Sequence, residues 1–178
     1  MLKRISFLLA VIFSLTFVVP VSAQVPRCDG RFDSCSVQLL ASTAITAATS
    51  AAGTAGSTIS RMQRFREGLV MLDVTAVPAF GGQTLDVSVQ TLVGGVWTDL
   101  IAFGQITTSS ARRIARWTSR ALPSTTEGSV QARGGPYTAL SAGTVNEGMP
   151  ISDSVRVVYY APASTSAYTF SVTGWFRE

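Results

Sequence analysis

Apolar and polar residues alternate with a period of two over several short stretches of the chain. Residues 85–90 read Leu-Asp-Val-Ser-Val-Gln, residues 155–160 read Val-Arg-Val-Val-Tyr-Tyr, and residues 168–173 read Tyr-Thr-Phe-Ser-Val-Thr. Residues 69–74 follow the same pattern before Pro78. Because successive side chains of a strand point to opposite faces, this period predicts half-buried β-strands.

Glycine pairs and Ser/Thr clusters separate these stretches. Gly94-Gly95 lies between two apolar runs and predicts a tight hairpin, with a returning strand over 96–103. Residues 112–117 fit either a helix or a strand, and the flanking Ser/Thr clusters and Pro123 favour a strand. Shorter runs surround Val130 and residues 137–140.

About eight short strands with regular turns predict an all-β fold, an antiparallel, jelly-roll-like β-sandwich. We expect the sandwich over residues 61–178. Residues 24–60 carry both cysteines and an Ala/Ser/Thr-rich run, and we expect an extended arm that docks on a neighbouring subunit. Deletion of this arm should then leave a folded domain that no longer assembles. An edge strand that orders on assembly is the alternative.

Residues 1–23 have the composition of a secretory signal peptide. Lys3 and Arg4 precede an apolar run that ends at Pro20, and Val21-Ser22-Ala23 fits a cleavage site. A membrane anchor is the alternative, but the run is shorter than the ~20 residues of a spanning helix. We therefore expect cleavage after Ala23, no membrane association afterwards, and a secreted or virion-associated protein.

Cys28 and Cys35 are the only cysteines, separated by turn-forming residues. In an exported chain this arrangement predicts a local disulfide. A redox or zinc pair is the alternative, but the spacing is not Cys-x-x-Cys and two ligands do not complete a zinc site.

Composition narrows the chemistry. The chain has no histidine and its single lysine is Lys3, which excludes His-dependent triads, His-ligated zinc and a Schiff-base lysine in the mature chain. No two carboxylates have a spacing that places them together as an acid–base pair, so we expect no enzyme, no metal and no cofactor. Without the leader the net charge is only +2, from 12 Arg against 10 Asp and Glu, which favours no specific nucleic-acid partner.

Arginines and aromatic residues are the candidates for contact with a partner. Arginines at positions 112–120 favour ion pairs on the surface or between subunits. Tyr159 and Tyr160 are adjacent, so one of them leaves the core, and Trp175 lies close to the C-terminus. The predicted interface residues are Arg112, Arg113, Arg116, Tyr160 and Trp175. A sugar-stacking platform of exposed aromatic residues is the alternative use.

Two stretches also carry a resemblance to a family. Residues 72–107 contain LDVT, LDVSVQ and WTDLIAF, and residues 151–176 contain DSVRV and TFSV. Over residues 68–176 the chain resembles small β-sandwich proteins of tailed bacteriophages and prophages. The leader departs from that family, whose members assemble in the cytoplasm. A membrane-associated virion protein, a misassigned start and a bacterial surface protein are the alternatives that it raises.

The resemblance implies a virion structural accessory protein, either a capsid-decoration or a tail component. Such a protein acts by assembly with other virion or surface subunits, as a homo-oligomer. The alternative is a secreted carbohydrate-binding or adhesion module, whose partner is a glycan.

Overall fold

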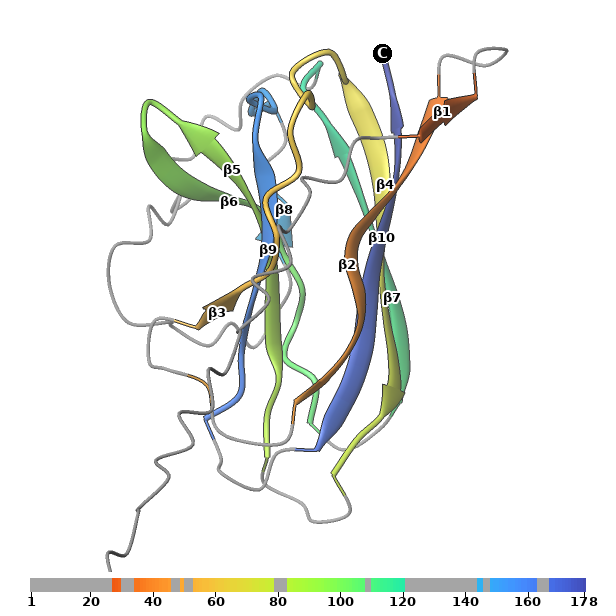
Figure 1. The fold of residues 1–178 in the computed structure, drawn as a ribbon, viewed down its shortest axis with the longest axis vertical. Coiled ribbons are helices and arrows are strands. Elements are labelled where there is room, and N and C mark those ends of the chain that lie inside the picture. Colours follow the sequence, from red (N-terminus) through yellow and green to blue (C-terminus); the bar gives the residue numbers. More distant parts are fainter. Residues whose placement is uncertain are drawn as a thin grey trace, which may run out of the picture.

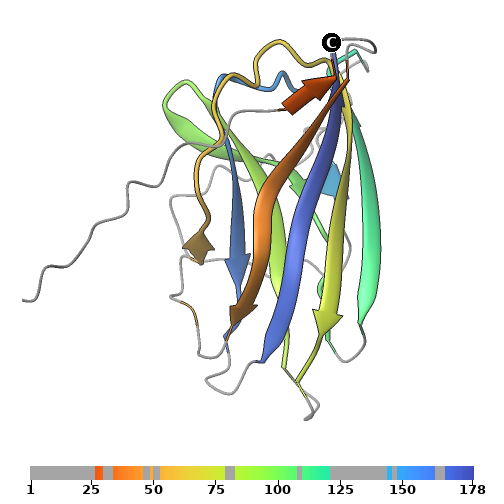
Figure 2. The same cartoon turned by 45° about the vertical axis from the view of Figure 1, so that its right-hand side comes forward.

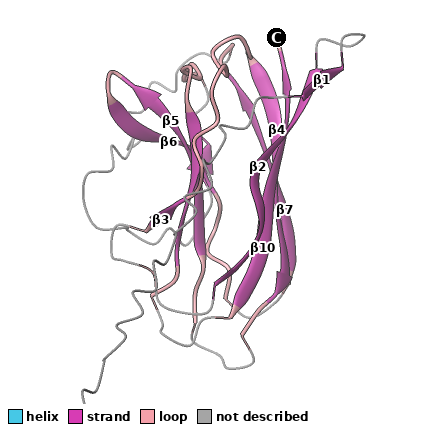
Figure 3. Ribbon diagram, viewed as in Figure 1, coloured by secondary structure: helices cyan, strands magenta, loops and turns pink. Residues whose placement is uncertain are grey.

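The fold was analysed in a computed structural model of the chain, which describes residues 27–29, 34–45, 49, 53–78, 83–107, 110–120, 144–145, 148–162 and 167–178. Within these residues every regular element is a strand, and strands joined by loops are all that Figure 3 shows there. The prediction of an all-β, antiparallel chain is confirmed.

Several predictions lie outside the described residues. They are the signal peptide and its cleavage site, the runs around Val130 and residues 137–140, and the loop between the two cysteines. These remain predictions.

The strands form two antiparallel sheets that face each other (Figure 1). The first has the order β1-β2-β10-β4-β7, and its long strands lie side by side in Figure 2. Its strands are β1 (Arg27–Asp29), β2 (Ser34–Ile45), β10 (Tyr168–Arg177), β4 (Glu67–Ala76) and β7 (Ala111–Thr118).

The second sheet has the order β3-β9-β5-β6-β8. Its strands are β3 (Thr54–Ala55), β9 (Val155–Tyr160), β5 (Asp86–Val93), β6 (Val96–Ala102) and β8 (Thr144–Val145). The hairpin predicted at Gly94-Gly95 is confirmed, because both glycines have positive φ, 58° and 82°, and join β5 to β6.

The core lies between the two sheets. Strands β2, β4, β5, β9 and β10 contribute alternate residues to it, such as Val70 and Leu72 from β4 and Val87 and Val89 from β5. Phe176 lies in this layer against two glycines: a Cβ added to Gly174 or Gly68 would lie 2.3 or 2.6 Å from the Phe176 ring. Glycine at both positions is therefore required by the space that the ring occupies.

The N-terminal segment is integral to the first sheet, so the boundary predicted at residue 60 is wrong. Strand β2 pairs with β10 from Ser34↔Arg177 to Ile45↔Tyr168, and Cys35, Val37 and Leu39 are buried. Their alternation with Ser and Gln was a period-two signal that the Ala/Ser/Thr-rich composition of the following residues obscured.

The antiparallel register places Cys28 directly opposite Cys35. Directly opposed residues of antiparallel strands have Cα atoms about 4.5–5.5 Å apart, which is within the range that a disulfide spans. The register is thus compatible with the predicted bond, which stays a prediction.

Candidate functional site

The most distinctive surface is the outer face of the first sheet, the face directed away from the core. Four apolar side chains lie on it, and three are well exposed: Ile114 at 65%, Leu69 at 46% and Trp175 at 44%. The fourth, Met71, is half-buried. We call these four residues the apolar stripe.

The strand register makes the stripe continuous. Trp175 of β10 is opposite Leu69 of β4, and Met71 of β4 is opposite Ile114 of β7. Because Leu69 and Met71 are two residues apart on one strand, all four side chains project from the same face. The stripe therefore crosses three neighbouring strands and ends at β7, the last strand of this sheet.

Ion pairs border the stripe at both ends. At one end Arg112 is bonded to both carboxylate oxygens of Asp73, with an Nη2–Oδ2 distance of 3.1 Å. This hydrogen bond and the attraction of the carboxylate raise the pKa of Arg112. At the other end Glu67 lies between Arg116, at 3.8 Å, and Arg177, at 3.6 Å. An apolar centre with a charged rim is the composition of a protein–protein interface.

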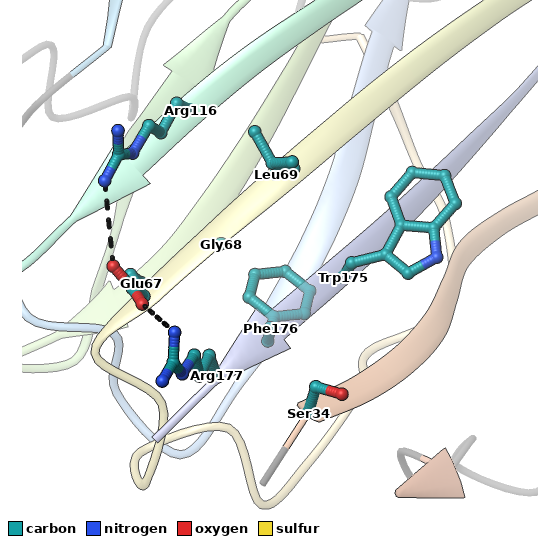
Figure 4. Close-up of a pocket in the computed structure, with 8 residues that line it drawn as sticks. All are labelled: Ser34, Glu67, Gly68, Leu69, Arg116, Trp175, Phe176 and Arg177. Carbon is teal, nitrogen blue, oxygen red and sulfur yellow. Dashed lines mark ion pairs between the residues drawn. The ribbon is translucent and has the colours of Figure 1, made fainter. Parts of the chain in front are cut away.

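A hollow of about 350 Å³ opens at the Glu67 end of the stripe. Figure 4 shows Glu67 and its two arginines on one side of the hollow and Trp175 on the other, with Leu69 between them. The remaining lining residues are Ser34, Gly68 and Phe176. The hollow thus has a charged wall and an apolar wall.

Three of the five predicted interface residues belong to this surface. Arg112, Arg116 and Trp175 project from the outer face. Arg113 is exposed on the same strand, but it alternates with Arg112 and approaches the carbonyl of Gln105 at 3.5 Å. Tyr160 lies in β9, in the other sheet.

The sequence prediction missed Leu69, Met71 and Ile114. Their positions in alternating strands made them equivalent to core residues, because a strand's own sequence does not show which face turns inward. Residues 111–118 contain apolar residues on both faces, and Trp117, not Ile114, is the residue that is fully buried.

The second sheet contains a buried polar group. Asp86, Ser88 and Gln90 of β5 alternate with core residues, yet each is at most 2% exposed. The strand alternation alone would turn Asp86 toward solvent, but its side chain is buried, and Gln105 donates a hydrogen bond to its carboxylate at 3.2 Å.

A row of three polar side chains crosses this sheet, and we call it the polar row. The Arg156 Nε donates to Gln90 Oε1 at 3.0 Å, and the Gln90 Nε2 donates to Asp99 Oδ1 at 2.8 Å. The Arg156 guanidinium also lies over the Trp97 ring, 4.2 Å from its centroid. Partial burial lowers the pKa of Arg156, and Asp99 opposes this shift.

The aromatic residues considered for a sugar-stacking platform are dispersed. Trp117 and Tyr168 are fully buried, Tyr159 packs edge-on against Phe170, and Trp97 is covered by Arg156. Trp175 is the most exposed of the tryptophans that the structure describes.

No three His, Cys, Asp or Glu side chains of the described ranges are grouped so that they would hold a metal ion. Those ranges also contain no helix of the length and hydrophobicity needed to cross a membrane. Comparisons with protein-family models, curated proteins and solved structures found no match to this chain.

Proposed function

We propose that the chain is a non-enzymatic structural accessory subunit of a virion, a capsid-decoration or tail component that acts by binding other protein subunits. The observation that carries the proposal is the apolar stripe with its bordering ion pairs. Exposed apolar side chains gathered across three strands are stabilised when a partner covers them.

The strand order supports a jelly-roll sandwich as the fold. The chain changes sheet between most consecutive strands: β2 and β3, β3 and β4, β4 and β5, β6 and β7, β7 and β8, and β9 and β10. Strands β5 and β6 form a hairpin within one sheet. Strands β2 and β10, close to the two ends of the chain, become neighbours. Double-sheet jelly rolls occur in viral capsid proteins and in lectins, so the fold agrees with both functions that the sequence raised.

Fractionation of the native source on a density gradient, followed by peptide mass spectrometry, tests the virion role. We expect this chain to co-sediment with particles that contain nucleic acid, and the first detected peptide to begin at Gln24. A non-reducing digest of the same fractions tests the Cys28–Cys35 bond. Recovery only in soluble or envelope fractions would contradict the virion role.

A matched pair of variants connects the particle association to the stripe. We expect Trp175→Ala to reduce co-sedimentation of the recombinant mature chain with particles that lack it. Val93→Ala serves as the control, because Val93 is 41% exposed but lies beside the β5–β6 turn. Equal losses from the two variants would exclude the stripe as the contact surface.

Carbohydrate binding is the second candidate, and one observation favours it. The half-exposed Trp175 ring lines the same hollow as charged groups able to bond sugar hydroxyls. Glycan-array binding by the wild-type chain that Trp175→Ala abolishes, with the fold retained, would support this function over assembly.

A further inference from the structure

The hollow has two features that together define a ligand. Its charged wall contains two arginines but one carboxylate, because Arg116 and Arg177 both approach Glu67. The Arg side chains are largely exposed, at 72% and 68%, and both distances to Glu67 exceed 3.5 Å. The wall thus has a net positive charge and guanidinium groups with free donor capacity.

The apolar wall lies within the same hollow. Leu69 and Trp175 are opposite each other in the register and both are close to half exposed. A ligand with an apolar side chain beside a carboxylate would therefore contact both walls of the hollow favourably.

We propose that the hollow binds an extended acidic segment of a partner protein subunit, with one aliphatic side chain against Trp175 and Leu69 and a carboxylate on Arg116 and Arg177. This inference rests on the proposed assembly function and specifies its partner. Charge complementarity is the argument for an acidic occupant: the outer face as a whole projects Arg112, Arg116 and Arg177 against Glu67 and Asp73. A basic segment would meet like charge there.

The probe is the N-acetylated, C-amidated peptide Gly-Ser-Asp-Leu-Asp-Ser-Gly, added to the full mature chain labelled with ¹⁵N. We expect a saturable shift of the Trp175 indole N–H resonance, assigned with Trp175→Phe. Replacing both Asp of the peptide by Lys, or its Leu by Ala, should weaken binding about tenfold, since each change removes one of the two contacts.

Matched variants separate a specific site from a general charge effect. Arg116→Gln and Arg177→Gln should each weaken binding about tenfold. Arg112→Gln removes the same charge from the same face outside the hollow, and should change binding less than about twofold. Equal effects of Arg112→Gln and Arg177→Gln, or the absence of a Trp175 shift at millimolar peptide, would overturn the proposal.

An oligosaccharide of uronic acids serves as the competing probe. A shift of the same resonance by this oligosaccharide, with none by the peptide, would refute the peptide site and support glycan binding. If the peptide fails to bind while the chain co-sediments with particles, only the occupant is wrong. If the peptide binds but no particle contains the chain, the virion role is wrong and the acidic site stands.

Discussion

The outward sides of the two sheets differ in burial, and in each case the burial is the opposite of what hydropathy predicts. On the first sheet, Leu69, Ile114 and Trp175 are apolar and exposed. On the second, Asp86 and Gln90 are polar and buried. The polar residues are satisfied by hydrogen bonds inside the chain, such as Gln90 to Asp99, so their burial carries no unmet cost. The apolar residues have no such internal solution, and under the proposed assembly function a partner would cover them.

The largest expected effect comes from removing β2. A chain that begins at Arg61 lacks the strand that pairs along β10, together with the buried Cys35, Val37 and Leu39. We expect it not to fold, because the core between the sheets would open at one side. Near-ultraviolet circular dichroism measures this: we expect the truncated chain to lack the signal that the chain from Gln24 to Glu178 gives. A folded truncated domain would restore the interpretation of residues 24–60 as a docking arm.

Two tryptophans test the difference between the core and the apolar stripe. Trp117 is fully buried and its Nε1 donates to the Met149 carbonyl at 3.1 Å, so Trp117→Ala should lower the free energy of unfolding by ~3–5 kcal/mol. Trp175→Ala should lower it by less than about 1 kcal/mol, since the residue is 44% exposed. Urea unfolding measures both. Similar losses would mean that Trp175 supports the fold and not a partner.

Two aspartates sharpen the comparison between the polar row and the ion pairs of the outer face. Asp99→Ala leaves the buried Gln90 amide without its acceptor and should cost ~1–3 kcal/mol of unfolding free energy. Asp73→Ala should cost clearly less, because water screens its pair with Arg112. Urea unfolding of both variants checks the order, and a larger loss from Asp73→Ala would contradict it.

The smallest effect concerns alkaline pH. Burial, and the nearby Asp86 carboxylate, raise the pKa of Tyr168, whose hydroxyl donates to the Thr107 carbonyl at 3.0 Å. Because the folded-state pKa lies above the unfolded value of about 10, stability is present below pH ~10 and is lost as pH rises through the folded pKa. Tyr168→Phe should therefore lose less thermal stability between pH 8 and pH 11 than wild type. If the difference in Tm between Tyr168→Phe and wild type is the same at pH 8 and pH 11, this prediction is wrong.

The strands were largely predictable because their signal is local. The alternation at residues 85–90, 155–160 and 168–173 needs only neighbours two positions apart, and the Gly94-Gly95 hairpin needs only its own φ angles. The candidate site was less predictable from the sequence. Arginines 112 and 116 and Trp175 were identified as surface candidates, whereas Leu69, Met71 and Ile114 were not.

By itself the sequence determined that the chain is built from antiparallel strands, and that it contains no histidine and a single lysine, Lys3. Only the tertiary structure decided which outward faces are covered and which are open. Strand β2 joins the sheet by pairing with β10, far away along the chain, and Asp73 meets Arg112 only through the pairing of β4 with β7. Burial depends on such distant partners, and a period of two in one strand contains no information about them.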